Sequence, residues 1–426
     1  MRARVHLSGT DTANMIGKSP TGPPAGRVMA RLKQQNKTVT SEQPGHWPPH
    51  QRRGRHENTM TTAPDNIAFK ITRKTDGTPA AERESLVANP GFGRAFTDHM
   101  AVVTYTEGRG WHTAEILPRQ PLMLDPAASV LHYAQEIFEG MKAYRAPDGR
   151  VQLFRPEANA RRFQKSAERM AMAQLPEDLF LEAVTQLVSI DRDWVPAPEV
   201  GTLYIRPFMI ATEAALGVKP ASEFKFIVIA CAAGEYFSKD AGPVSVWVET
   251  DTVRASRGGT GTAKCGGNYA ASLTAQMEGK HHGCQQVLFL DAEERRWLEE
   301  MGGMNVMMVF EDGTLLTPPL DGGTILHGIT RDSLLTLARD AGLSVKEERY
   351  ALDQLFADAK SGRLREVFAC GTAAVVSPIG AFKSKTDTCT INNARVGEVT
   401  ARLRQNLCDI QFGRVADPHN WISTVA

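Results

Sequence analysis

Short apolar runs alternate with amphipathic helical segments from residue 66 to residue 412, and this alternation most constrains the fold. Apolar and β-branched runs predict strands over residues 97–105, 111–117, 150–154, 202–211, 224–230, 244–249, 286–291, 304–311 and 366–376. Helical spacing predicts helices over residues 129–141, 158–172, 177–190, 269–276, 331–341 and 396–412, with Thr330 as the N-cap of the fifth. The alternation indicates an α/β protein whose strands and helices pack in layers.

Residues 233–243 interrupt the alternation with a segment of glycine, proline and charged residues. We therefore place a connector there, between a small α/β domain over residues 66–232 and a larger domain over residues 244–426. A chain of 426 residues is long enough for two or three domains, each with an apolar core of its own.

The first 59 residues differ from the rest in charge and composition. They contain ten Lys or Arg against three Asp or Glu, a net charge of +7, whereas the remaining residues carry 39 against 45, a net charge of −6. They lack apolar periodicity, so we predict a disordered leader or tail over residues 1–65. A basic patch around residues 52–55 or an organelle transit peptide has a similar composition. We expect either that Met60 is the functional start or that the leader is a disordered tail.

The overall composition argues against several classes of protein. Apolar residues make up 42% and charged residues 23% of the chain, and the formal net charge is +1. These values are typical of a globular protein and favour neither nucleic acid nor membrane as a partner, and no apolar run approaches the ~18 residues of a membrane span. The six cysteines are scattered without a CxxC pair, which indicates reduced thiols in the cytoplasm. We interpret the run HHGC at residues 281–284 as a surface loop and expect no metal site.

The first candidate for chemistry is a lysine between glycine-rich flanks, in the sequence GGTGTAKCGGNY at residues 258–269. Glycine allows tight turns and a close approach of a ligand to the backbone. A lysine in such a setting, Lys264, can lose its proton and act as an amine nucleophile, as in the Schiff base that binds pyridoxal phosphate (PLP). The same run is equally compatible with a solvent-exposed loop lysine.

PLP chemistry requires, besides the lysine, an acid at the pyridine nitrogen, a group that bonds the ring hydroxyl, and an anion site for the phosphate. Glu300 is the candidate acid because the pair Glu299-Glu300 leads into two glycines and a strand, although such pairs usually lie on the surface. Tyr269 follows Lys264 across a turn, so its hydroxyl can reach the same ligand.

Three further segments are candidate phosphate sites. Ile329 and Thr330 lie at the start of a predicted helix, where N–H groups and the helix dipole favour an anion, although an ordinary capped helix is more common. Thr372 lies at an interruption of the predicted strand 366–376, which fits either an anion site or a bulge. Arg162 lies on a predicted helix, where a solvated face is the default interpretation.

Seven segments, taken in order along the chain, resemble those of branched-chain amino-acid aminotransferases, which belong to the fold-type IV PLP enzymes. The segments are TDHM at 97–100, HYAQEIFEGMKAYR at 132–145, YIRP at 204–207, KCGGNY at 264–269, EMGGMN at 300–305, GITR at 328–331 and GTA at 371–373. The resemblance covers residues 66–422 and is closest to the bacterial members. It implies a two-domain α+β architecture like that of D-amino-acid aminotransferase, with PLP bound by the larger domain.

The resemblance also implies a role for each candidate in holding PLP. Lys264 matches the lysine that forms the imine and shuttles a proton between substrate and cofactor. Glu300 matches the acid at the pyridine nitrogen, and Tyr269 matches the phenol bonded to the ring oxygen. Four residues are expected to hold the phosphate: Arg162, Ile329, Thr330 and Thr372. Ile329 and Thr330 are expected to do so through their backbone N–H groups.

The remaining matches concern the substrate and the partner subunit. Tyr204 and Arg206 match the pair that receives carboxylates, and an arginine suits the distal carboxylate of glutamate. Leu216 and Val218 match a loop that reaches into the partner's site, so a homodimer is expected. The resemblance implies a mainly apolar substrate pocket formed by Phe92, Tyr133, Phe138, Tyr236, Gly303 and Ala373. Gly303 stands where many members of the family carry threonine.

The sequence therefore predicts a transaminase that moves the amino group of L-leucine, L-isoleucine or L-valine to 2-oxoglutarate by a ping-pong route, giving the branched 2-oxo acid and L-glutamate. One methylene changes binding in an apolar pocket by only ~1–3 kcal/mol, so all three branched substrates are expected to react. One alternative is a D-amino-acid transaminase or aminodeoxychorismate lyase of the same fold, against which the YIR and FEG segments argue. The other is a non-catalytic nucleotide- or anion-binding module that uses the glycine loop.

Overall fold

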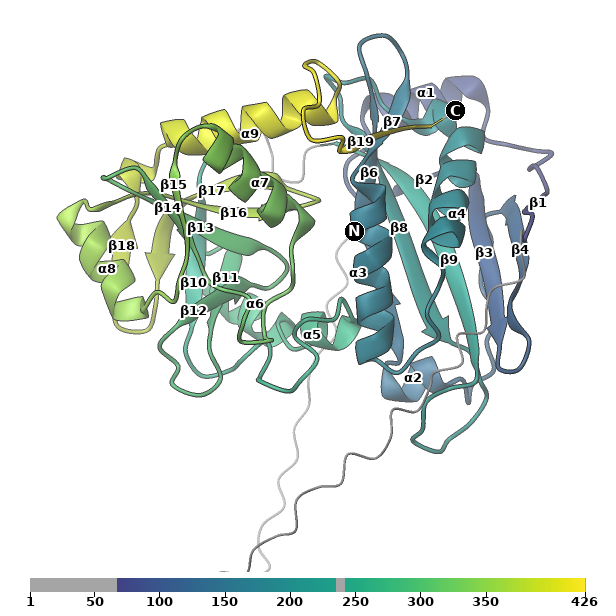
Figure 1. The fold of residues 1–426 in the computed structure, drawn as a ribbon, viewed down its shortest axis with the longest axis horizontal. Coiled ribbons are helices and arrows are strands. Elements are labelled where there is room, and N and C mark those ends of the chain that lie inside the picture. Colours follow the sequence, from purple (N-terminus) through teal and green to yellow (C-terminus); the bar gives the residue numbers. More distant parts are fainter. Residues whose placement is uncertain (1–66, 235–241, 426) are drawn as a thin grey trace, which may run out of the picture. The chain divides into compact units, whose positions relative to one another are not determined.

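The computed structural model describes residues 67–234 and 242–425. The predicted leader over residues 1–65, most of the predicted connector, and Tyr236 lie outside the described residues. Within them the strands form two sheets, and helices pack against each sheet (Figure 1).

The first sheet has ten strands, in the order β1-β4-β3-β9-β8-β6-β7-β19, with β2 paired to β9 and β5 paired to β8. Its pairs are antiparallel except β1 with β4. The strands are β1 (Lys70–Ile71), β2 (Ala95–Phe96), β3 (His99–Thr106), β4 (Gly110–Pro118), β5 (Glu136–Phe138), β6 (Met141–Arg145), β7 (Val151–Phe154), β8 (Thr202–Ala211), β9 (Glu223–Ala233) and β19 (Ile422–Val425). The pairing of β19 with β7 brings the end of the described chain back to this sheet, a return that the sequence pattern does not predict.

The second sheet has nine strands, in the order β12-β11-β10-β17-β16-β13-β14-β15, with β18 paired to β17. Parallel and antiparallel pairs are mixed, because β10 pairs in parallel with β11 and β17 while β16 and β17 form an antiparallel hairpin. The strands are β10 (Val244–Glu249), β11 (Gln286–Leu290), β12 (Leu298–Met301), β13 (Asn305–Phe310), β14 (Thr314–Thr317), β15 (Ser344–Glu347), β16 (Leu364–Gly371), β17 (Val375–Lys383) and β18 (Thr388–Thr390).

Two helices, α3 and α4, pack their apolar faces against the first sheet. Phe163 of α3 and Phe180 of α4 pack with Phe226 of β9, with ring centroids 5.3 and 5.6 Å from the Phe226 ring. Helix α3 begins at Pro156, a position where the missing N–H has no helical partner to lose. The helices that precede the second sheet are α1 (Ala80–Ala88), α2 (Ser129–Tyr133), α3 (Pro156–Arg169) and α4 (Glu177–Ile190).

Alternating side chains of the second sheet face two different cores. On β13, Met307 and Val309 pack with α7 and α9, whereas Val306 and Met308 pack in the cluster that contains Leu355 of α8. This follows from the two-residue period of a strand. The helices of this half are α5 (Gly266–Ala270), α6 (Leu273–His281), α7 (Ile329–Asp340), α8 (Leu352–Ser361) and α9 (Glu398–Gln411).

Most predicted elements are confirmed, and three coincide with their predicted bounds: residues 177–190 form α4, residues 202–211 form β8 and residues 244–249 form β10. The predicted helix over residues 129–141 is wrong beyond Tyr133. Ala134 adopts a left-handed conformation with φ +48°, and the chain then forms β5 and β6, both paired with β8. The apolar residues there have helical spacing, but hydrogen bonding to the long strand β8 makes residues 136–138 and 141–145 strands.

Three smaller predictions also need correction. The break predicted at Gly371 and Thr372 in the run 366–376 is confirmed, but the two sides are not parts of one strand, because β16 ends at Gly371 and the chain turns back into β17. Residues 269–276 are divided between α5 and α6. Thr330 is not the N-cap of α7, which is Gly328. A Cβ at Gly328 would lie 2.0 Å from the Asn305 side-chain oxygen, so the helix begins where only glycine fits against β13.

Candidate active site

Lys264 lies between the glycine-rich loop and α5. Residues of α3 and β5, which belong to the first sheet and its helices, form hydrogen bonds with its backbone. Its N–H donates to the Ser166 hydroxyl on α3 at 3.0 Å, and its carbonyl accepts from the Phe138 N–H of β5 at 2.9 Å. Close packing elsewhere in the loop also requires glycine, because a Cβ at Gly261 would lie 2.4 Å from the Thr324 carbonyl oxygen. The loop is therefore a packed segment and not the solvent-exposed lysine loop of the alternative interpretation.

The Lys264 side chain is half-buried between two aromatic rings. Its amine donates to the Tyr269 hydroxyl at 2.8 Å and lies 4.9 Å from the centre of the Phe138 ring. The Phe138 and Tyr269 rings meet edge to face with centroids 4.9 Å apart. The structure thus brings together three of the predicted site residues, with a lysine amine beside a phenol.

Glu300 lies on β12 and is 3% exposed. One of its carboxylate oxygens is 2.7 Å from a guanidinium nitrogen of Arg254 and accepts from the Leu326 N–H at 3.1 Å. The other accepts from the Asn305 side-chain amide at 3.3 Å. Burial raises the pKa of Glu300, and the Arg254 charge opposes the rise. Glu300 is therefore a buried and comparatively basic carboxyl group that a cation keeps from being isolated.

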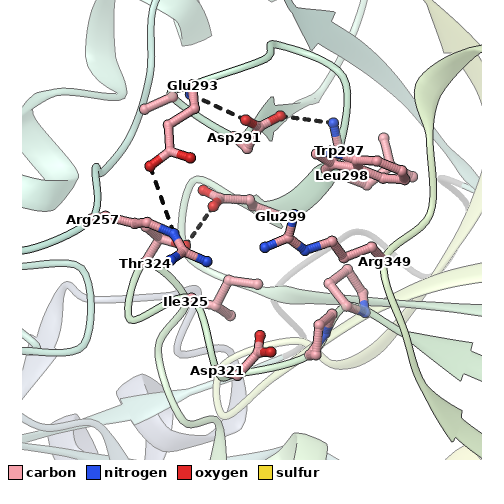
Figure 2. A pocket seen from close by; sticks show the side chains of 14 residues that line it. Arg257, Asp291, Glu293, Trp297, Leu298, Glu299, Asp321, Thr324, Ile325 and Arg349 are labelled. Atoms are coloured by element: carbon pink, nitrogen blue, oxygen red, sulfur yellow. Dashed lines mark hydrogen bonds and ion pairs between the residues drawn. The ribbon is translucent and has the colours of Figure 1, made fainter.

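The neighbouring acid, Glu299, points to the other side of the strand, as the two-residue period requires. It lines a pocket of ≈ 50 Å³ and accepts a hydrogen bond from the Thr324 hydroxyl. Figure 2 shows it beside Thr324 and Arg257. Burial raises the pKa of Glu299 as well. The predicted Glu pair is thus divided, and only Glu300 lies among the candidate active-site groups.

Arg162 is 8% exposed and makes a two-pronged ion pair with Glu139, with N–O distances of 2.8 and 2.7 Å. Its third guanidinium nitrogen donates to the His327 carbonyl at 3.0 Å, next to the start of α7. The Asn159 amide donates to the same Glu139 carboxylate at 2.7 Å. Arg162 is therefore fixed in orientation and does not lie on a solvated helix face.

The start of α7 lies beside this arginine and has no side-chain cap, because its N-cap is Gly328. Ile329 is half-buried and Thr330 is buried. An uncapped helix N-terminus beside a fixed guanidinium has the donors and the dipole that an anion requires.

The turn between β16 and β17 contains the half-buried Thr372 and Ala373. A Cβ at Gly371 would lie 3.5 Å from the Gly303 carbonyl oxygen, and one at Gly303 would lie 3.3 Å from the Tyr269 ring. The turn and Gly303 thus adjoin the lysine and phenol. The Lys142 amine donates to the Ala373 carbonyl at 2.9 Å.

Tyr204 and Arg206 lie on the same face of β8, two residues apart. Arg206 donates to the Tyr204 hydroxyl at 3.0 Å, and its guanidinium lies 4.8 Å from the centre of the Phe138 ring. The Phe92 ring meets the Tyr204 ring edge on, at 5.2 Å. The buried Nε of Arg206 has no hydrogen-bond partner in the described part of the chain, so this cation retains a donor for a ligand.

Two of the predicted substrate-site residues, Leu216 and Val218, do not reach this cluster. They are 69% and 84% exposed. Tyr133 donates a hydrogen bond from its hydroxyl to the Leu216 carbonyl, so it belongs with this exposed loop.

Two charged residues of the site, Glu139 and Arg254, were not predicted from the sequence. Glu139 is completely buried and Arg254 is 5% exposed, and each is the ionic partner of a predicted site residue. The only sequence signal for such a buried ionic partner was a charged residue among apolar neighbours, as in the FEG segment that contains Glu139.

The structure thus places a half-buried lysine amine beside a phenol, and a fixed arginine beside a helix N-terminus. Residues 136–382, more than half of the chain, match the model of the class IV amino-transferase family, and the chain belongs to this family.

Individual proteins of this family are similar to the chain over most of its length. The chain is 56% identical over 347 residues to the probable branched-chain-amino-acid aminotransferase of Streptomyces coelicolor, covering 81% of this chain and 95% of that protein. It is 51% identical over 362 residues to the branched-chain-amino-acid aminotransferase of Mycolicibacterium smegmatis, covering 84% and 98%. The solved branched-chain amino acid aminotransferase of Escherichia coli is similar with a TM-score of 0.61 and 26% identity, covering 76% of this chain and 99% of that chain. The family predicted from the sequence is confirmed.

Proposed function

We propose that this chain is a PLP-dependent transaminase that moves the amino group of L-leucine, L-isoleucine or L-valine to 2-oxoglutarate. The observation that carries the proposal is the half-buried Lys264 amine, 2.8 Å from the Tyr269 hydroxyl, in a chain of the class IV family. The names of its relatives support the branched-chain substrates.

The residues of the site fit PLP. Arg162 and the uncapped N-terminus of α7, with the N–H groups of Ile329 and Thr330, would hold the phosphate, and the Thr372 hydroxyl would add to them. When bound, PLP supplies an electron sink for the bond that breaks at the substrate Cα.

The chain's own groups have distinct tasks around that sink. Lys264 would bind the cofactor through Nζ and, when released from it, would carry the proton to and from the substrate Cα. Tyr269 accepts the Lys264 hydrogen bond and fixes the direction of the amine. Glu300 would accept the pyridine N–H, and burial, which raises the pKa of Glu300, makes its carboxylate a stronger acceptor. The Arg254 charge opposes the effect of burial on the Glu300 pKa and so favours the charged carboxylate.

The substrate side combines apolar rings with one cation. Phe92, Phe138 and Tyr204 remove the branched side chain from water at about 25 cal/mol per Å² of apolar surface. Arg206 pairs with the distal carboxylate of glutamate, and its unpartnered Nε is available for this contact. Gly303 lets the backbone approach the Tyr269 ring, and Ala373 lies in the turn that adjoins it.

The exposed loop of Leu216 and Val218 supports a homodimer. Apolar side chains this exposed mark a contact surface, and Met123, Leu131 and Tyr133 are exposed as well. We propose that this loop enters the partner's site. Light scattering on the purified protein should give twice the chain mass, and Val218→Asp should shift it toward the monomer.

The six cysteines are all free, which supports a reducing compartment, and we propose the cytoplasm. In residues 67–234 and 242–425, none of the helices has the length and apolarity needed to cross a membrane.

The test is a transamination assay with L- and D-leucine, L-isoleucine, L-valine and 2-oxoglutarate. The proposal expects glutamate from all three L-amino acids and none from D-leucine. Turnover of D-leucine alone would indicate a D-amino-acid transaminase instead. A protein that stays colourless after PLP is added and turns over no amino acid would contradict the proposed function.

A further inference from the structure

A buried ammonium group links the first sheet to the turn at residues 371–375. Lys142 lies on β6, is 7% exposed, and donates from its amine to the Ala373 carbonyl at 2.9 Å. The two residues are 231 positions apart in the sequence. Burying an ammonium group costs free energy unless the group is hydrogen-bonded. The bond to the Ala373 carbonyl therefore helps to stabilise the buried amine of Lys142 and fixes its position.

The turn that accepts this bond contains a strained residue. Val375 has φ +61°, in the left-handed region, although it is β-branched. Val375 pairs with Gly371 across the turn as the last register pair of β16 and β17. A β-branched residue holds this conformation only where surrounding contacts enforce it.

Apolar packing restrains the end of the turn, because Ala374 and Val375 pack against the two cores of the second sheet. On the inner side, Gly371 adjoins Gly303, which adjoins the Tyr269 ring. On the other side, Ala373, Ala374 and Val375 line a groove of ≈ 580 Å³ that Lys142 also lines. Ala373 belongs to neither core, so the Lys142 hydrogen bond restrains the middle of the turn, which apolar packing does not hold.

We propose that Lys142 is a positioning residue, which holds the strained turn so that its backbone N–H groups face the substrate carboxylate. The inference rests on the proposed function, which places Thr372 and Ala373 against bound ligand. Lys142 touches the Ala373 carbonyl and acts through it, so its loss should weaken substrate binding more than it slows the chemical step.

The first test compares Lys142→Met, which keeps the apolar stem and removes the donor, with Lys142→Arg, which restores a charged donor. With PLP saturating, Lys142→Met should raise KM for L-leucine about tenfold and change kcat less than about threefold, and Lys142→Arg should recover most of the loss. A fall in kcat with an unchanged KM would overturn the inference.

Hydrogen exchange reads the turn without any substrate. Lys142→Met should speed exchange of the amides of residues 372–375 about tenfold and leave those of β8 and β9 unchanged. Unchanged exchange in the turn would overturn the inference even if activity fell. Failure of the wild-type protein to react with any branched amino acid would instead refute the proposed function, while exchange still decides whether Lys142 holds the turn.

Relief of the strain gives an independent check. Val375→Gly removes the cost of the positive φ, so the turn should then need Lys142 less. Lys142→Met should raise KM about tenfold in the wild-type background but less than about threefold in the Val375→Gly background. Equal effects in both backgrounds would show that the lysine and the strained turn are not coupled, which contradicts the inference.

Discussion

Arg162 and Glu139 form a two-pronged ion pair with N–O distances of 2.8 and 2.7 Å, and the Glu139 side chain is completely buried. Because the carboxylate neutralises the arginine, the pair offers an incoming phosphate directed N–H donors and little net charge. Glu139 therefore determines where Arg162 points, next to the start of α7.

Glu139→Gln should weaken PLP binding and destabilise the protein. The amide places a donor against a guanidinium donor, which leaves Arg162 buried without its ionic partner, at a cost of about 3–5 kcal/mol. The loss of one oriented charged hydrogen bond predicts a Kd for PLP about ten- to hundredfold higher. Absorbance titration of the apoprotein gives the Kd, and urea unfolding gives the stability. Asp148→Asn, which breaks an exposed pair with Arg150, should change neither.

The stability difference between wild type and Glu139→Gln should depend on pH. Burial works to raise the pKa of Glu139, but Arg162, Lys264 and Asn159 together bring it below its ordinary value of 4.5. The folded state therefore binds fewer protons than the unfolded state around pH 4, so this contribution is complete above pH 4.5 and is lost as the pH falls through the folded pKa. Unfolding midpoints at pH 7 and pH 4 should show the difference shrink. A difference that grows on acidification would contradict the assignment.

Arg206→Leu should separate the two substrate classes. Arg206 has an unpartnered buried Nε and stacks on Phe138, so its loss removes a partner for the distal carboxylate of glutamate. A hydrogen bond to a charged group contributes about 1.5–3 kcal/mol, which predicts a kcat/KM for L-glutamate about ten- to hundredfold lower. The value for L-leucine should change less than about threefold. Equal losses for both amino acids would place Arg206 outside the substrate contact.

Two cysteine thiols should be unreactive in the folded protein. Burial raises the pKa of Cys370 to about 12 and that of Cys389 to about 11. Since the thiolate is the reactive form, both should react with a disulfide reagent at pH 8 at least about 10²-fold more slowly than a free thiol. Peptide mapping should find Cys408, the one half-buried cysteine, labelled first. Early labelling of Cys370 would mean that the hairpin next to the site opens.

The sequence predicts those features whose signal is local. Helix α4 and strands β8 and β10 have clear periodicity, and the glycine flanks single out Lys264. Residues 129–141 have helical spacing, yet pairing with β8 decides their structure, and that pairing leaves no local trace.

The ionic partners of the site residues could not be predicted for the same reason. Glu139 and Arg162 are 23 positions apart and meet only when β5 and α3 pack together. Arg254 and Glu300 are far apart in the sequence and form a buried ion pair. The composition of the chain does not reveal that either residue is buried. What the sequence indicates is the chemistry of single residues, and what the fold adds is the groups that orient them.

The most direct test of the account asks which amine holds the cofactor. The purified protein is saturated with PLP, reduced with borohydride to fix the cofactor to its lysine, digested, and mapped by mass spectrometry. The account predicts a phosphopyridoxyl group on Lys264, and predicts that Lys264→Ala loses the visible absorbance band and at least about 10³-fold in activity. A label on another lysine, or a coloured and active Lys264→Ala protein, would contradict it.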